Sequence, residues 1–568
     1  MLNAAAVPKR THNEDLKEGN PLLSGNIAQT LADSSAVSFT HDDYEYLKFH
    51  GIYQQDDRDL RKTGKQFIYM VRTRFPGGTL SADQYLACDT LAGQYGNNTL
   101  RITTRQDFQL HGVVKSNLRQ TMKGLNEALM STLAACGDVA RNVMAPPTPA
   151  TSPLVEEVLA DARVLSTELS PKTHAYHSIW LEGTELDLNA EPNKSFVDPL
   201  YGKTYLPRKF KVAFAFPPLN DVDIFANDLG FVVVSEGGVL VGYTVLAGGG
   251  LGMSHGNAQT FPRLADVVGY IPREDLVAVS KAVLQVHRDF GDRTNRKHAR
   301  LKYVIEERGL PWFRQEVEAR LGKPLAPAKP FEFTRQGDVL GWNRQLNGKW
   351  FLGLFVENGR VLDREGYRLR SALREIVSRF KPEVRLTASQ NLLLVDLDEA
   401  NREAIHTILA SHGVDDKNPY SASRLASMAC PAMPTCGLAL AESERALPDV
   451  MTRIDALLAD VGLKGEEVIV RMTGCPNGCA RPYMAELAFV GKAPGKYQVF
   501  IGGNEGSTRL NWIYKESVKV DDLEAELRPL FARFHTERNT SERFGDWCAR
   551  TQPKPPAAAD TTATAPSN

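Results

Sequence analysis

Four of the seven cysteines in this 568-residue chain fall in two short turns rich in proline and glycine. Cys430 and Cys436 form a C-x5-C motif, and Cys475 and Cys479 form a C-x3-C motif. Proline and glycine produce turns, and turns let closely spaced thiolates converge while backbone N–H groups point at sulfur. Four thiolates can hold a cubane iron–sulfur cluster. The two motifs therefore predict such a cluster.

A structural zinc site is the main alternative. Zinc ligand pairs are usually separated by roughly two to four residues, so the gap between Cys430 and Cys436 fits zinc poorly. Buried unligated thiols or a disulfide are a weaker alternative, because packing cysteines rarely gather in two such turns. We interpret the other three cysteines as structural. Two are in segments predicted to be helical and one is near the C-terminal end: Cys88, Cys136 and Cys548.

Length and composition indicate an ordinary globular protein of two to four domains. Hydrophobic residues make up 42% and charged residues 24% of the chain, and the formal net charge is −1. Bulk charge therefore predicts neither nucleic-acid nor membrane binding. No apolar run approaches membrane-spanning length, and the N-terminus lacks the apolar stretch of a signal peptide. Thiols available for metal suit a reducing compartment, so we expect a cytoplasmic protein.

Basic residues recur on one face of several predicted strands. Arg72 lies in a strand predicted over 67–75. Arg101 and Arg105 share the polar face of an alternating segment, for which the pattern alone favours a solvated edge. Lys209 and Lys211 lie opposite an apolar face, which suits a buried anion site better than a surface strand.

Three further segments are less specific. Arg141 precedes two prolines that end regular structure. Arg300 and Lys302 belong to a basic run at helical spacing, whose default interpretation is a solvated helix face. The glycine run at 248–252 lets backbone approach a ligand closely, but no helix-initiating GxGxxG accompanies it, so we reject a dinucleotide fold.

The second half of the chain echoes the first. The segment 101–110 aligns with 385–394, and 229–250 resembles 487–503. A duplicated α+β unit would form a pseudo-twofold body with a cofactor between its halves. We expect an N-terminal arm and wrapping segment (1–66), two half domains (67–135 and 336–410), two repeat domains (136–335 and 411–551, the latter with the cysteines) and a disordered tail (552–568).

The cysteine motifs, with the run Gln54–Asp59, resemble the sulfite and nitrite reductases that carry siroheme and a [4Fe–4S] cluster. The resemblance covers roughly residues 45–550 and is strongest to the NADPH-linked sulfite reductases. It implies an α+β, duplicated pseudo-twofold fold of mixed sheets and helices, with cofactors between the halves. It also implies that all four cysteines hold the cluster and that Cys479 is the axial ligand of the siroheme iron.

The resemblance implies roles for basic and polar residues as well. Siroheme carries several carboxylates, which fork-shaped guanidinium groups bind in bidentate fashion. Its expected contacts are Arg101, Arg105, His111, Arg300, Lys302, Gln390, Asn477 and Gly478. Sulfite is a small dianion that must be held and protonated. Its expected contacts are Arg72, Arg141, Lys209 and Lys211.

The electron donor is expected to be another protein, because the sequence has no flavin or NADPH fingerprint. The resemblance implies a flavoprotein (FAD/FMN) reductase subunit that passes electrons from NADPH, hence a hetero-oligomer. A ferredoxin-dependent sulfite or nitrite reductase of the same fold is the alternative. A zinc- or cluster-stabilised structural or RNA-binding protein is a third hypothesis, from a different class.

Overall fold

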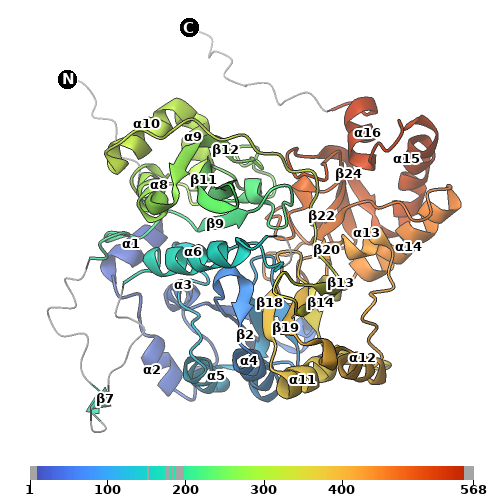
Figure 1. The fold of residues 1–568 in the computed structure, drawn as a ribbon. Helices are drawn as coiled ribbons and strands as arrows, with labels where there is room; N and C mark the ends of the chain where they lie inside the picture. The colour runs from blue at the N-terminus through green and yellow to red at the C-terminus, as the bar shows by residue number, and fades with distance from the viewer. Residues whose placement is uncertain (1–8, 150–151, 173–179, 182–183, 186–196, 555–568) are drawn as a thin grey trace, which may run out of the picture.

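The structure is a computed structural model that describes residues 9–149, 152–172, 180–181, 184–185 and 197–554. Four five-stranded sheets organise the molecule. In Figure 1, two sheets lie in the lower part of the view, and one lies at the upper left and one at the upper right, with helices packed against them. Nearly all of the predicted disordered tail lies outside the described residues.

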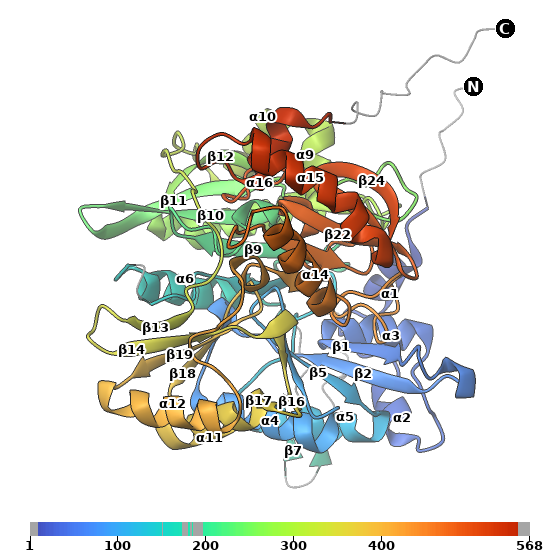
Figure 2. The same ribbon diagram turned by 90° about the vertical axis from the view of Figure 1, so that its right-hand side faces the viewer.

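The two lower sheets exchange strands between the halves of the chain. Short β3 comes from the first half but pairs with β18, and short β15 comes from the second half but pairs with β4. One apolar core lies beneath both sheets. The two half domains are therefore one body, seen at the bottom of Figure 2. The strand orders are β1 (Ile52–Asp56), β2 (Phe67–Arg72), β5 (Phe108–Val113), β4 (Leu100–Ile102), β15 (Arg360–Val361), and β13 (Gly341–Arg344), β14 (Trp350–Leu354), β19 (Leu392–Leu397), β18 (Glu383–Leu386), β3 (Thr79–Leu80).

The upper sheets share one topology. Each has two parallel pairings followed by two antiparallel ones. Leu229 pairs with Val212 in one sheet, and Leu487 pairs with Val470 at the same place in the other. The predicted duplication is confirmed. The strands are β6 (Ala140–Met144), β9 (Phe210–Ala215), β10 (Leu229–Glu236), β11 (Val239–Ala247), β12 (Asp266–Pro272), and β20 (Met428–Ala429), β21 (Val470–Thr473), β22 (Leu487–Ala493), β23 (Lys496–Ile501), β24 (Trp512–Lys519).

Helices pack against these sheets, and α6 (Val155–Glu168) lies in the middle of the molecule in both views, between the first upper sheet and the lower sheets. The helices of the half domains are α4 (Ala82–Tyr95), α5 (Lys115–Glu127), α11 (Leu369–Phe380) and α12 (Arg402–Ser411). Those around the first upper sheet are α6 (Val155–Glu168), α8 (Leu276–Phe290), α9 (Leu301–Arg308) and α10 (Leu310–Leu321), and those around the second are α13 (Ala422–Leu425), α14 (Leu447–Asp460), α15 (Leu523–Glu537) and α16 (Phe544–Thr551). No described helix is long and apolar enough to cross a membrane.

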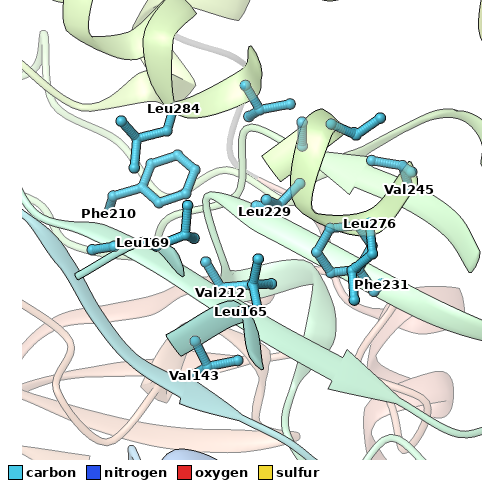
Figure 3. Packing of buried hydrophobic residues seen from close by; sticks show 14 of the residues in the cluster. Val143, Leu165, Leu169, Phe210, Val212, Leu229, Phe231, Val245, Leu276 and Leu284 are labelled. Carbon is cyan, nitrogen blue, oxygen red and sulfur yellow. The ribbon is translucent and has the colours of Figure 1, made fainter. Parts of the chain in front are cut away.

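Strand β9 is held by packing on its apolar face. Phe210, Val212 and Phe231 are fully buried beneath α8 (Figure 3). Burying each such side chain stabilises the fold by about 1.5–3 kcal/mol. The alternation of the strand then leaves Lys211 on the other face, as the sequence predicted. Packing on one side thus fixes the position of a charge on the other.

Some local predictions hold and others fail. Cys88 lies in helix α4, as predicted, and Ser81 caps that helix in a capping box with Gln84. Cys136 does not lie in a helix, because α5 ends at Glu127 and an irregular segment follows. The region 438–461 contains one helix, α14, whose Pro448 occupies the first turn, where a missing N–H is harmless. The basic run before Leu301 is a loop rather than a helix face.

The N-terminal segment is structured. We expected an N-terminal arm and wrapping segment over residues 1–66, and its described part contains helices α1 (His12–Gly19), α2 (Ile27–Ala32) and α3 (His41–Phe49). The Lys17 side chain is buried, and its Nζ lies 2.6 Å from the Glu14 carboxylate and 2.8 Å from the Leu206 carbonyl oxygen. The described arm therefore packs on its own chain. The polar composition of the arm did not indicate this packing, because its buried residues Lys17 and Glu14 are charged and pair with each other.

Candidate functional site

The four cysteines of the two motifs meet at the ends of two parallel strands. Cys430 directly follows β20, and Cys475 follows β21 by two residues. These strands are neighbours, with Ala429 paired to Met472. The carboxyl ends of parallel strands lie at one edge of a sheet, so loops that are far apart in the sequence converge there. The fold thus explains why the two motifs act together.

Among the four cysteines, Cys479 has the largest electrostatic effect on the pKa of the other three thiols. It is exposed, whereas Cys430 and Cys475 are buried. Burial, followed by the charge of Cys479, raises the pKa of Cys430 and Cys436 and raises that of Cys475 to about 11. Backbone and amide donors oppose this effect: Gly474 N lies 3.4 Å from Cys430 Sγ, and Asn477 Nδ2 lies 3.4 Å from Cys475 Sγ. Bound iron would favour the thiolate forms further.

The four thiols lie within electrostatic range of one another. Four thiolates are the number that a four-iron cubane takes as ligands. The donor set therefore fits a [4Fe–4S] cluster.

Four of the predicted cations lie in or beside strands near Cys479. Arg72 ends β2, Arg141 lies in β6, Lys209 directly precedes β9 and Lys211 is its second residue. In the part of the chain that the structure describes, none of these four forms an ion pair with a carboxylate. Arg72 and Lys209 both lie within electrostatic range of Cys479. The predicted sulfite residues are thus brought together near the predicted iron ligand.

These cations lack an anion to neutralise them. Burial and the charges of Arg208 and Arg300 lower the pKa of Lys209 to about 7. Burial and the charges of Lys209 and Arg105 lower the pKa of Lys211 well below its usual value. A bound anion would relieve this repulsion. The site therefore fits a polycarboxylate macrocycle with an anionic substrate.

Arg72 has neighbours that the sequence did not indicate as functional. Its Nη1 lies 3.3 Å from Cys136 Sγ, and its guanidinium lies 6.0 Å from the Tyr53 ring centre. The Gln109 amide lies between Arg72 and His111, 3.0 Å from Nε of the arginine and Nε2 of the histidine. Cys136 therefore lies beside a predicted site residue rather than in a helix.

Comparisons with known proteins agree with this geometry. The profile described as "Nitrite/Sulfite reductase ferredoxin-like half domain" matches residues 60–128 and 343–412, and "Nitrite and sulphite reductase 4Fe-4S domain" matches 160–325. The "Sulfite reductase (NADPH) hemoprotein beta-component" of Myxococcus xanthus is 49% identical over 94% of this chain and 96% of its own length. The chain belongs to the nitrite and sulfite reductase family.

Other relatives have the same length and fold. The corresponding Staphylococcus saprophyticus protein is 46% identical over 94% of this chain and 95% of its own. The solved structure of Mycobacterium tuberculosis NirA is 25% identical, covers 95% of this chain and 96% of its own, and superposes with a TM-score of 0.78. The family's half-domain profile matches both halves of the strand-exchanged body, consistent with the duplication.

Within the family fold, Arg101 and Gln390 lie behind the cluster loop. Both donate to the Ala429 carbonyl oxygen, Arg101 Nη2 at 2.7 Å and Gln390 Nε2 at 2.9 Å. Arg101 also forms an ion pair with Glu444 at 3.0 Å. Both side chains are buried. They position the residue before Cys430, while the Oε1 atom of Gln390 has no partner in the described structure.

Arg105 is placed differently. Its Nη1 lies 3.0 Å from Asn227 Oδ1, and one Nη2 contact is the Val212 carbonyl oxygen at 3.0 Å. Its buried Nε has no hydrogen-bond partner among the described residues. Burial lowers its pKa to about 9. Arg105 is thus a predicted siroheme contact with one unpaired donor, Nε, to offer a carboxylate.

Arg300 and Lys302 are engaged by the protein. Arg300 pairs with the buried Asp228 at 2.7 Å. Lys302 Nζ donates to the carbonyl oxygens of Gly250 and Gly252, each at 3.0 Å. A Cβ at Gly250 would meet the Arg300 guanidinium at 3.1 Å. Both residues therefore support the glycine loop, and that loop lies against Asn477, whose carbonyl oxygen is 3.3 Å from the Cβ position of Gly252.

The turn between Cys475 and Cys479 requires glycine. Gly478 has a φ of 63°, and a Cβ there would lie 2.9 Å from the Tyr483 ring. Larger side chains are excluded by both conformation and space.

His111 is buried, and burial lowers its pKa well below the usual value, so the imidazole is neutral near pH 7.

Asp138 is a site residue that sequence reasoning missed. Its buried carboxylate accepts hydrogen bonds from Arg296 Nη1 at 2.6 Å and Nη2 at 3.0 Å. The same carboxylate lies 3.4 Å from Lys17 Nζ and 4.0 Å from Arg208 Nη1. These cations lower its pKa strongly against the effect of burial. Asp138 thereby joins helix α1 to Arg208, whose charge acts on Lys209.

Proposed function

We propose that this protein catalyses the six-electron reduction of sulfite to sulfide at a siroheme coupled to a [4Fe–4S] cluster, as the hemoprotein component of an assimilatory sulfite reductase. The observation that carries the proposal is the pairing of four convergent thiols with a set of cations that have no carboxylate partners. The full-length relatives named as NADPH sulfite reductase hemoproteins support it.

Each cofactor has its protein ligands. Cys430, Cys436, Cys475 and Cys479 would hold the cluster, and Cys479 would also be the protein ligand of the siroheme iron. Arg105, with its unpartnered Nε, leads the siroheme contacts, and Arg101, Gln390, Arg300 and Lys302 act mainly by supporting the loops around it. When bound, the cofactors supply the electron-transfer chemistry. The side chains supply position and charge.

The substrate contacts bind sulfite and supply protons to it. Arg72, Arg141, Lys209 and Lys211 attract the sulfite dianion and hold its oxygen atoms. Each S–O bond that breaks needs protons, so that the oxygen leaves as water. Lys209, with a pKa of about 7, exchanges a proton readily near neutral pH, as a general acid should. The other cations stabilise charge that develops on the departing oxygen.

Electrons come from a separate flavoprotein subunit that oxidises NADPH, and the two proteins form a hetero-oligomer. The chain lacks a dinucleotide or flavin fingerprint, and NADPH stands in the printed name of its relatives. All seven cysteines are free thiols, which supports a cytoplasmic location.

The test compares two substrates in one assay. Purified protein should show a red absorption band from siroheme, and should turn over sulfite with reduced methyl viologen at a higher kcat/KM than nitrite. A preference for nitrite would assign the protein to nitrite reduction. A colourless zinc protein would overturn both assignments.

A further inference from the structure

Arg481, two residues after Cys479, holds both halves of the molecule at once. Its backbone has a left-handed φ of 52°, and the residue is only 6% exposed. The guanidinium donates from Nη1 to the Thr104 carbonyl oxygen at 3.0 Å and from Nη2 to the Ala388 carbonyl oxygen at 2.9 Å. Its Nε pairs with the buried Asp223.

These partners occupy positions related by the internal duplication. Thr104 and Ala388 lie in matching turns, because Thr103 N donates to Asp107 O and Thr387 N donates to Asn391 O. Asp223 precedes Leu229 by six residues, as Arg481 precedes Leu487, and both have left-handed backbone before a 3-10 turn. Arg481 therefore lies where the pseudo-twofold halves meet.

Thr104 hydrogen-bonds to both Cys479 and Arg481. Its hydroxyl donates to the Cys479 carbonyl oxygen at 2.9 Å, while its own carbonyl accepts from Arg481. The matching turn has Ala388 at this position, which lacks a hydroxyl. Only the turn of the first half can hold Cys479 in this way.

We propose that Thr104 and Arg481 are positioning residues that fix Cys479 relative to both halves of the fold, and so set its sulfur against the siroheme iron. This inference rests on the proposed function, since it presumes that iron is bound there. The opposing view is that Arg481 only stabilises the interface, where Asp223 also binds Arg471 at 2.7 Å and Ser507 at 2.7 Å. Thr104 is the cleaner test, because its hydroxyl bonds Cys479 and takes no part in that network.

The experiment compares Thr104→Val, which removes the hydroxyl at nearly constant shape, with Thr104→Ser, which keeps it. We expect Thr104→Val to fold and retain iron and acid-labile sulfide, but to show an altered siroheme spectrum, a shifted midpoint potential and about a tenfold lower turnover, the scale of one lost hydrogen bond. Thr104→Ser should restore all three. Wild-type spectrum, potential and turnover in Thr104→Val would overturn the inference.

A second variant covers the case in which Thr104→Val does not fold. Arg481→Lys keeps the charge toward Asp223 but loses the forked donation to Thr104 and Ala388. It should change the siroheme spectrum in the same direction, and an unchanged spectrum would again refute the inference. If the wild-type protein itself bound no siroheme, the proposed function would fail first, which is a distinguishable result.

Discussion

Arg72, Arg141, Lys209 and Lys211 lie close together without carboxylates to balance them. Such an arrangement is costly in an empty pocket, since like charges raise each other's energy in a poorly solvated space. A fold that keeps this arrangement must recover the cost when an anion binds. Burial, followed by the charges of Arg208 and Arg300, lowers the pKa of Lys209 to about 7, which agrees with a poorly solvated, cation-rich site.

Lys209→Met should keep both cofactors and lose about a hundredfold or more in sulfite turnover, since it deletes a positioned acid and a stabilising charge. Cofactor content and kcat measure the two effects separately. Lys203→Met, at an exposed lysine nearby, is the matched control and should leave kcat unchanged. Normal kinetics in fully loaded Lys209→Met would remove Lys209 from the substrate site.

Cys475→Ser should lose the cluster and, with it, the siroheme, because the two sites share the Cys479 loop. Iron, acid-labile sulfide and the visible spectrum report the loss. Cys88→Ser, at a buried thiol in α4, should lose neither. Persistence of iron and sulfide in Cys475→Ser would refute the ligand assignment.

The sequence indicated many site residues, because the cysteine motifs are local and the basic residues follow strand alternation. It could not indicate what Arg101 binds, because Glu444 lies 343 residues away. Nor could it place Cys136 beside Arg72, since a single cysteine outside a motif carries no signal. The individual roles of the basic residues stay predictions.

At the scale of elements, the ends of strands position the cysteines, and ion pairs attach the N-terminal helix α1 to the rest of the protein. The loops after β20 and β21 carry the cysteines, and β9 presents its lysines because the opposite face is packed. Helix α1 is attached through Lys17 and Asp138. Local sequence predicted the strands and α4, but not α1, whose partners are remote.

Asp138→Asn should lower the free energy of unfolding by about 3–5 kcal/mol at pH 7, because it leaves buried cations uncompensated. The folded-state pKa of Asp138 is depressed, so its stabilising effect is present above the usual value of about 3.9 and is lost as the pH falls below it. The difference between wild type and variant should therefore shrink in acid. Denaturant unfolding at several pH values measures this.

The control for that series is Asp83→Asn. Asp83 is an exposed carboxylate that pairs with Lys381, and its loss should change stability by only about 0.5 kcal/mol or less. A pH-independent difference between wild type and Asp138→Asn would show that shape, rather than charge, is what Asp138 contributes.

At the scale of the molecule, the two duplicated halves contribute different residues to the candidate site. The first upper sheet supplies Arg141 and the lysines, and the second supplies the cysteines. Sequence echoes predicted the repeat, but not the exchange of β3 and β15, because two-residue strands leave no periodic pattern. The domain limits drawn from sequence stay predictions.

The isolated chain should not oxidise NADPH, because it has no fingerprint for binding a nucleotide or flavin. Absorbance at the NADPH band should stay constant until a flavoprotein reductase subunit is added, and then fall with sulfite present. If reduced ferredoxin alone restored turnover, the donor would be ferredoxin. NADPH oxidation by the homogeneous chain would refute the donor argument.

The most direct test of the central claim is the electron stoichiometry of sulfite reduction. The purified chain, supplied with reduced methyl viologen and limiting sulfite, should oxidise six viologen radicals for every sulfide released. Absence of sulfide, or a protein that holds zinc in place of iron, would contradict the account.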